Sequence, residues 1–286
     1  MKPPKRIEPL IEDGLVDEVL RQLMSGKEAS VYVVDCGGEI RCAKVYKEAN
    51  RRGFHQAVHY TEGRKVKNSR KARAMEKGTR YGKQEQEAAW QRTEVDALYR
   101  LAAAGVRVPH PYGFYEGVLL MELLTDADGA PAPRLNDLAL TEAQALEFHA
   151  LLIRQVVLML CAGVIHGDLS EFNILVDANG PVIIDLPQAV DAAANNNAFR
   201  MLARDVENLA AYFGQFAPTL LNTRYAEEIW AIYQTGELAP DTPLTGRFCE
   251  DDSPADVQAV MREIVAARAE HEARLHYQQI KREQGR

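Results

Sequence analysis

One stretch of the sequence limits the choice of fold more than any other. Residues 164–176 read VIHGDLSEFNILV, and a second apolar run at 182–184 leads directly into Asp185. The segment 177–180 between the two apolar runs reads DANG. Two short runs of β-forming residues joined by Asp, Asn and Gly predict a β-hairpin. The chain therefore carries an acid and an amide in the loop before a hairpin, and a second acid directly after it.

The spacing of these polar residues indicates phosphoryl transfer. Asn173 follows Asp168 by five positions, and Asp185 comes after the hairpin. In phosphoryl transfer a carboxylate orients the attacking hydroxyl group, while an amide oxygen and a second carboxylate hold magnesium on the nucleotide phosphates. The pattern corresponds to the D-x-x-x-x-N loop of kinases and to the aspartate of D-F-G. The D-x-x-x-x-N spacing alone is common by chance, whereas its combination with a hairpin and a further aspartate is rare.

A lysine within an apolar strand supplies a further group for this chemistry. Lys44 lies in the run 42–46, CAKVY, and a lysine with apolar neighbours is costly to bury without a partner. In the kinase plan such a lysine contacts the nucleotide phosphates and pairs with a glutamate on a helix. Glu94 is the candidate partner, although Glu85 and Glu87 lie on the same predicted helix. The alternative for Lys44 is an edge-strand side chain that points to solvent.

The segment 25–32, SGKEASVY, precedes the first predicted strand and suits a loop that covers phosphates. It is not a Walker A motif, because Arg21 stands where the first glycine is required and Glu28 where serine or threonine is required. It is not the G-x-G-x-x-G loop of ordinary protein kinases either, because Gly26 is its one glycine.

Apolar periodicity predicts the other elements and two lobes. The first half reads as a hairpin at 31–34 and 40–46, a helix at 85–104 and a buried strand at 118–122. The second half is mainly helical, with helices at 142–162, 200–216, 223–233 and 254–281. The linker-like segment 125–133 marks the boundary between a lobe at 1–124 and a lobe at 125–286. We expect the α+β class, with residues 51–83 as a flexible basic loop and 254–281 as a long charged helix.

The composition favours a soluble globular protein. The chain is 47% hydrophobic and 26% charged, with a net charge of −7, which argues against a protein that binds nucleic acid over its whole surface. The four cysteines form no C-x-x-C pair and predict neither a zinc site nor a disulfide framework. No apolar signal segment follows the first residues, and the apolar stretch at 156–164 is too short to cross a bilayer. We expect a cytoplasmic protein with no membrane partner.

Taken together, these segments resemble the RIO family of atypical serine/threonine protein kinases. They extend over about two thirds of the chain, and LSEFN at 169–173 is the most specific run. The matching pieces are 25–29, 43–46, Trp90 with Glu94, 119–122, 166–173, 183–185 and 204–208. Few residues precede the loop at 25–30, which favours the RIO branch without an N-terminal winged helix. A bacterial source is compatible with this branch, and the family's link to ribosome maturation would not transfer to such a source.

The resemblance implies a two-lobed kinase fold that uses ATP with magnesium, or with manganese as the alternative metal. It implies Asp168 as the catalytic base, Asn173 and Asp185 as metal ligands, Lys44 on the phosphates and Glu94 as the residue that positions Lys44. Met121 and Glu122 would form the hinge beside adenine. The residues that would cover the phosphates are Ser25, Gly26, Lys27, Glu28, Ala29 and Ser30. The segment 51–83 corresponds to the family's flexible loop, in which Ser69 and Thr79 are candidate autophosphorylation sites.

The sequence also departs from kinase patterns. Pro187 follows close behind Asp185 and offers no backbone N–H. Gly167 stands where ordinary kinases have the arginine that binds a phosphorylated activation loop, and no A-P-E motif follows, because Ala217-Pro218-Thr219 does not match it. We therefore expect no full activation segment and no gating by its phosphorylation.

Three other functions share these residues. The first is an ATPase-type switch in a macromolecular, ribosome-like complex, with an aspartyl-phosphate at Asp185 and with RNA or an acidic protein against residues 64–83. The second is a small-molecule phosphotransferase of the aminoglycoside or choline kinase type, which the segments 25–32 and 170–172 disfavour. The third is a pseudokinase scaffold, which the presence of Lys44, Asp168, Asn173 and Asp185 disfavours.

Overall fold

The computed structural model describes residues 2–26, 28–47 and 80–249, with the side chains of 80–90 excepted. Met1–Phe248 forms one unit and Cys249–Arg286 a second, and the description below concerns the first. The predicted helix at 254–281 lies outside the described residues. So do Lys27, Ser69, Thr79 and most of the predicted loop at 51–83.

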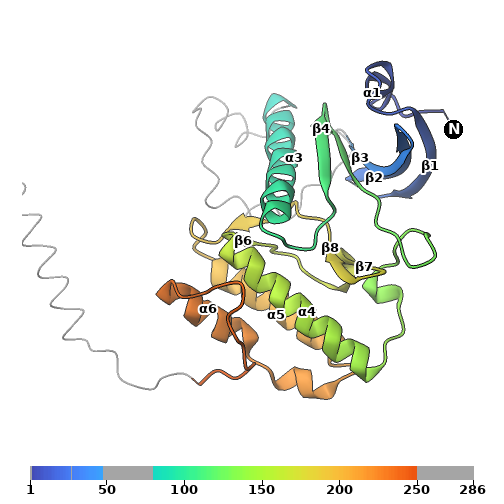
Figure 1. The fold of residues 1–286 in the computed structure, drawn as a ribbon. Helices are drawn as coiled ribbons and strands as arrows, with labels where there is room; N and C mark the ends of the chain where they lie inside the picture. The colour runs from blue at the N-terminus through green and yellow to red at the C-terminus, as the bar shows by residue number, and fades with distance from the viewer. Residues whose placement is uncertain (1, 27, 48–79, 250–286) are drawn as a thin grey trace, which may run out of the picture. The chain divides into compact units, whose positions relative to one another are not determined.

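A five-stranded antiparallel sheet forms the N-terminal part of the fold (Figure 1). Its order is β1 (Glu18–Ser25), β2 (Ala29–Cys36), β3 (Glu39–Tyr46), β5 (Val118–Glu122) and β4 (Pro111–Tyr115). The predicted hairpin of β2 and β3 is confirmed, and the strand predicted at 118–122 is β5. The turn between β2 and β3 needs glycine, because Gly37 and Gly38 have φ of 70° and 84°.

The sequence patterns did not predict β1, β4 or the short helix α1 (Glu8–Glu12). In β1 most side chains are exposed and Val19 is the buried one, so no alternation of apolar and polar residues marks the strand. The segment 25–32, expected to precede the first strand, instead joins two strands, since Ser25 ends β1 and Ala29 begins β2. Strand β4 begins at Pro111, which is tolerated because β4 lies at the edge of the sheet.

Helix α3 (Arg80–Ala103) packs beside the sheet and confirms the helix predicted at 85–104. It begins earlier than predicted, so residues 80–83 are helical and do not belong to a loop. Val95, Leu98 and Leu101 are buried and join the main hydrophobic core. Gly105, with φ of 76°, ends the helix as expected, and the N–H of Val106 bonds back to the Leu101 carbonyl.

The rest of the unit is mainly helical, as predicted. It contains α4 (Glu142–Cys161), α5 (Ala198–Phe213) and α6 (Tyr225–Thr235), together with the hairpin of β7 (Ile174–Asp177) and β8 (Gly180–Ile183). The two short strands β6 (Val164–Ile165) and β9 (Val190–Asp191) pair with each other. The 3-10 turns are η2 (Leu135–Asp137), η3 (Glu171–Asn173) and η4 (Pro218–Asn222). The result is an α+β fold with a β-rich and a helical part.

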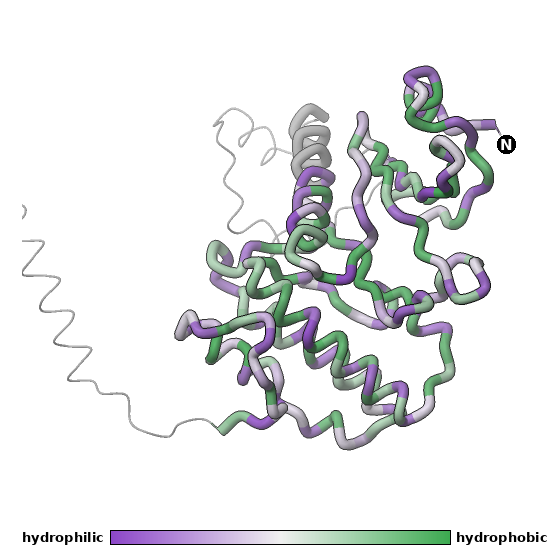
Figure 2. The backbone as a smooth tube through the Cα atoms, viewed as in Figure 1, coloured by the Kyte–Doolittle hydropathy of each residue, from purple (hydrophilic) through white to green (hydrophobic). Residues whose placement is uncertain are grey.

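Helix α4 is the central helix of this part, as its apolar sequence predicted. Hydrophobic residues recur along its length, with hydrophilic residues spaced among them (Figure 2). Leu152, Val157 and Leu160 are almost fully buried, whereas Leu146 and Leu151 are exposed. By length and composition alone α4 is apolar enough to cross a membrane, but half of its most apolar segment is buried in the protein. A core helix has the same length and composition, so this is weak evidence for a membrane span.

Candidate functional site

Lys44 lies at the centre of the site, on β3. Its Nζ donates to Glu94 Oε1 at 2.5 Å and to Asp185 Oδ1 at 2.9 Å. The three side chains come from the sheet, from α3 and from the segment after β8. Strand β3 lies between β2 and β5, so the alternative of an edge-strand lysine is wrong. The Lys44 side chain is 13% exposed and that of Glu94 is 5% exposed.

The ion pairs between these side chains shift the pKa values of Lys44 and Asp185. Burial by itself would lower the pKa of Lys44, but Glu94 and Asp185 outweigh it and raise that pKa above its usual value. Burial also tends to raise the pKa of Asp185, but the charge and hydrogen bond of Lys44 prevail and lower it. Lys44 and Asp185 are therefore charged at neutral pH. The hydroxyl of Tyr46, also on β3, donates to Glu94 Oε2 at 2.6 Å and fixes the second carboxylate oxygen.

Asp185 follows the hairpin in an unusual backbone conformation. Its φ is 65°, in the left-handed region that residues other than glycine seldom adopt. The ion pair with Lys44 holds the side chain, which is still 44% exposed. Nothing in the sequence pattern indicates this conformation. It leaves an ionised carboxylate that reaches open space as well as Lys44.

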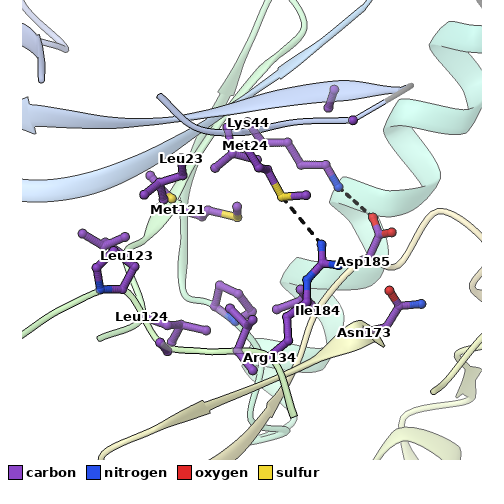
Figure 3. Close-up of a pocket in the computed structure, with 18 of the residues that line it drawn as sticks. Leu23, Met24, Lys44, Met121, Leu123, Leu124, Arg134, Asn173, Ile184 and Asp185 are labelled. Atoms are coloured by element: carbon purple, nitrogen blue, oxygen red, sulfur yellow. Dashed lines mark hydrogen bonds and ion pairs between the residues drawn. The ribbon is translucent and has the colours of Figure 1, made fainter. Parts of the chain in front are cut away.

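Lys44, Glu94, Asn173 and Asp185 line one cavity of about 680 Å³. Figure 3 shows a largely apolar end, with Leu23, Met121, Leu123 and Leu124, and a polar end, with Lys44, Asn173 and Asp185. An apolar pocket with a few convergent polar groups is typical of a small-molecule site. Of the residues predicted to bind nucleotide, those that line this cavity are Gly26, Glu28, Ala29, Lys44, Glu94, Met121, Glu122, Asn173 and Asp185.

Ser25 and Ser30 do not line the cavity but hold the turn between β1 and β2. Their hydroxyl oxygens are 3.1 Å apart. Lys47, which no sequence prediction included, donates from Nζ to the Gly26 carbonyl at 2.6 Å and to Ser25 Oγ at 3.0 Å. No sequence motif marks Lys47, which follows directly after β3.

Asp168 and Asn173 lie on a loop without regular strands or α-helix. Asn173 Nδ2 donates to the Asp168 backbone carbonyl at 2.9 Å, which ties the two ends of the loop together. The amide oxygen of Asn173 is directed toward Asp185 (Figure 3). Burial raises the pKa of Asp168, with a smaller contribution from the negative charge of Asp185, while His166 and Arg204 oppose the shift.

Helix α5 holds this loop by its backbone. The Asp205 carboxylate accepts from Gly167 N at 2.7 Å and from Leu169 N at 2.9 Å. Asn208 Nδ2 donates to the Leu169 carbonyl at 2.9 Å, and Arg204 donates to the Gly167 carbonyl. Burial raises the pKa of Asp205 to about 6, although these N–H groups and the charges of His166 and Arg204 oppose it. The segment 204–208 was part of the resemblance, but no role was predicted for its members.

Glycine is favoured at position 167 because its φ of 78° lies in the left-handed region. This explains in local terms why the arginine of ordinary kinases is replaced there. Only residues 186–197 separate Asp185 from α5, and part of them forms β9. The expected shortness of this segment agrees with the structure.

The polar end of the cavity fits a magnesium ion by its donor set. Asn173 and Asp185 offer an amide oxygen and a carboxylate oxygen, and magnesium prefers oxygen ligands, few of them from protein, completed by water and substrate phosphates. In the described part of the chain no cluster of three or more His, Cys, Asp or Glu side chains could hold a metal by itself. The donor set thus suits a metal that arrives with a phosphorylated substrate.

Comparison with known proteins gives consistent matches. The family model RIO1, described as the RIO domain, matches residues 30–226, more than half of the chain. The RIO-type serine/threonine-protein kinase Rio1 of Haloferax volcanii is 35% identical over 207 residues, which are 71% of this chain and 66% of the relative. The serine/threonine-protein kinase rio1 of Schizosaccharomyces pombe is 30% identical over 210 residues, 71% of this chain and 40% of the relative.

The human serine/threonine-protein kinase RIO1 is 28% identical over 217 residues, 75% of this chain and 36% of that protein. The chain therefore spans from about a third to just under two thirds of the length of these three relatives.

Proposed function

Since this chain belongs to the RIO family, we propose that it is an atypical serine/threonine protein kinase that transfers the terminal phosphate of ATP to hydroxyl groups, including its own. The observation that carries the proposal is Lys44, held between Glu94 and Asp185 at the polar end of the cavity. A lysine that must meet phosphates has to stay charged and fixed, and these two carboxylates do both. The names of the relatives agree with this activity.

In this proposal the phosphates lie at the polar end of the cavity. Lys44 contacts them from the sheet, while Glu94 and Tyr46 keep its side chain in place. The turn between β1 and β2, with Gly26, Glu28 and Ala29, covers them. Met121 and Glu122, at the end of β5, lie at the apolar end and border the adenine ring.

Asn173 and Asp185 would hold magnesium, with manganese as the alternative. When bound, the metal offsets negative charge on the phosphates. Asp185 is suited to this role because its pKa is lowered and its carboxylate stays ionised. The hydrogen bond from Asn173 Nδ2 to the Asp168 carbonyl directs the amide oxygen away from the loop backbone, which favours a ligand role for that oxygen.

Asp168 would accept the proton of the attacking hydroxyl group. Its carboxylate is exposed at the surface of the loop, where a protein substrate can approach. Burial of part of the group raises its pKa, which brings a carboxylate closer to the working range of a general base. Asp205 and Asn208 hold the backbone on both sides of Asp168, so the base has a defined position.

Labelled ATP provides the test. Pure protein would be incubated with magnesium and ATP labelled on the terminal phosphate, beside Asp168→Ala and Asp185→Ala, and the labelled protein treated with hydroxylamine. A kinase gives label that survives hydroxylamine and falls by about 100-fold or more in Asp168→Ala. Asp128→Ala, a change of an exposed carboxylate outside the cavity lining, is the matched control and should keep most of the label. Absence of label in the wild type contradicts the proposal and directs attention to small-molecule acceptors.

A second candidate is the ATPase-type switch with an aspartyl-phosphate at Asp185. The observation that favours it is the Asp185 carboxylate itself, which is ionised and 44% exposed and so is able to act as a nucleophile. In this case hydroxylamine releases the label, and Asp185→Ala abolishes it. The same experiment therefore separates the two functions.

A further inference from the structure

Arg134 is a second cation of the cavity, and none of the sequence motifs includes it. It follows the linker segment 125–133 and comes directly before η2. Among the described residues that line the cavity, the positively charged ones are Lys44 and Arg134. They reach into it from opposite sides, Lys44 from the sheet and Arg134 from the helical part (Figure 3).

The two cations differ in their partners. Lys44 forms ion pairs with two carboxylates, Glu94 and Asp185. In the described part of the chain no carboxylate forms an ion pair with Arg134. Its side-chain contact is from Nη2 to the Met24 sulfur at 3.8 Å. A thioether is a weak acceptor, which makes it a poor partner for a guanidinium group.

The backbone of Arg134 is fixed, so its side chain has a defined origin. Arg134 forms an isolated β-bridge with Leu175 of β7, and its carbonyl accepts from Asp137 N at 3.0 Å. Next to it, Val176 N donates to the Pro133 carbonyl at 2.9 Å. The same hairpin leads to Asp185, which lines the cavity together with Arg134. Figure 3 shows the guanidinium group between the apolar end of the cavity and the end that carries Asn173 and Asp185.

We propose that Arg134 binds the phosphate chain of the nucleotide from the side opposite Lys44. This inference rests on the proposed function, because it takes ATP as the ligand. The planar guanidinium fork suits two phosphate oxygens at once, and it would exchange the weak Met24 contact for charge-assisted hydrogen bonds. Arg134 thus adds a second positive charge to the cavity, beside that of Lys44.

Such a contact is made in the bound substrate as well as in the transition state. Removing it should weaken binding of every nucleotide with a phosphate chain. Adenosine, which has the base and ribose but no phosphate, should be unaffected. If Arg134 instead closed the cavity through Met24, or contacted ribose, its removal would weaken the binding of adenosine and of ADP equally.

The experiment compares dissociation constants of ATP, ADP and adenosine for the wild type, Arg134→Gln and Arg134→Lys by titration calorimetry at fixed magnesium. Arg154→Gln, an exposed arginine on α4 outside the cavity lining, is the matched control. We expect Arg134→Gln to weaken ADP and ATP about 10-fold with adenosine unchanged, since a hydrogen bond to a charged group is lost. Arg134→Lys, which keeps the positive charge but not the guanidinium fork, should lose less affinity for ADP and ATP.

Equal losses for ADP and adenosine, or no loss for ADP in either variant, would overturn the role of Arg134. Circular dichroism tests whether each variant is folded. If Arg134→Gln does not fold, the ratio of the ADP and adenosine dissociation constants of Arg134→Lys decides the question. An Arg134→Gln variant that keeps wild-type affinity for ADP and ATP, while the wild type is still labelled by ATP, contradicts the inference alone. A wild type that binds no nucleotide contradicts the proposed function, and the inference with it.

Discussion

The two walls of the cavity position their functional groups by different means. On the sheet wall, Lys44 sits in a regular strand whose register with β2 and β5 fixes where the side chain points. On the opposite wall, Asn173 sits on a loop that has no ladder of its own, and the same loop carries Asp168, outside the cavity lining, and Gly167 at φ of 78°. Backbone pairing positions the first wall, whereas side chains from α5 position the second.

The comparison shows where each wall is vulnerable. The sheet wall depends on one buried ion pair, because Lys44 is costly to bury without Glu94. The loop wall depends on hydrogen bonds that the Asp205 carboxylate accepts from the backbone of Gly167 and Leu169, and on the one that Asn208 donates to the Leu169 carbonyl. The two walls should therefore respond differently to loss of charge, to loss of a hydrogen bond and to pH.

The largest effect is expected on the sheet wall. Glu94→Ala leaves Lys44 with only the partly exposed Asp185 and removes the acceptor of the Tyr46 hydroxyl, so the free energy of unfolding should fall by about 3–5 kcal/mol. Urea denaturation measures this. Asp96→Ala, an exposed change on the same helix, should cost less than about 0.5 kcal/mol. Similar losses in both variants would mean that the ion pair is not what stabilises this wall.

The loop wall should lose slightly less stability but most of its activity. Asp205→Ala leaves the N–H groups of Gly167 and Leu169 without their acceptor, which should lower the free energy of unfolding by about 3 kcal/mol. Because the loop carries the proposed base, transfer of label should fall further than ATP affinity does. Glu207→Gln, an exposed change on α5, is the control. Strong loss of ATP affinity in Asp205→Ala would show that the walls are not independent.

The raised pKa of Asp205 should determine how the stability of the protein changes with pH. Its pKa is raised to about 6, so between about pH 4 and pH 6 the folded protein binds more protons than the unfolded chain, and its stability falls as pH rises. Relative to Asp205→Asn, the wild type should lose on the order of 2 kcal/mol over this window.

Asp185 should change stability with pH in the opposite direction, because its pKa is lowered. Its contribution to stability is present above the ordinary aspartate pKa and is lost only as pH falls below that value. Urea unfolding of the wild type and of Asp205→Asn at a series of pH values tests whether Asp205 causes the fall in stability between pH 4 and pH 6. A difference between the two proteins that stays constant from pH 4 to pH 6 would contradict it.

The smallest effect is expected from the hydrogen bond behind the ion pair. Tyr46→Phe removes only the hydroxyl that donates to Glu94, and the free energy of unfolding should fall by about 1 kcal/mol. Tyr32→Phe on β2 is the matched control and should change it by less than about 0.5 kcal/mol. Thermal unfolding of the pair measures both. A Tyr46→Phe variant as stable as the wild type would show that Glu94 is fixed by Lys44 alone.

Much of the fold was predictable because its elements have strong local patterns. The hairpin of β2 and β3, the hairpin of β7 and β8 and helix α4 were all predicted from apolar periodicity and turn residues. Strands β1 and β4 were not, because β1 is mostly exposed and β4 begins with proline. Edge strands bury few side chains, so little in their sequence distinguishes them from loops.

The sequence by itself determined which groups the site offers. The spacing of Asp168, Asn173 and Asp185 and the lysine in an apolar strand are local facts, and they are sufficient to indicate phosphoryl transfer and the RIO resemblance. Such motifs are readable because a catalytic loop and a hairpin keep functional residues close together along the chain.

Only the tertiary structure decided how these groups are supported. It brought Glu94 within 2.5 Å of Lys44 from 50 residues away, set Asp205 under the loop from 36 residues away, and aimed Arg134 into the cavity from outside every motif. The physical reason is that a buried charge or a buried N–H needs a partner, but any element that packs against it is able to supply one. Sequence spacing records neighbours along the chain, and these partners are neighbours only after folding.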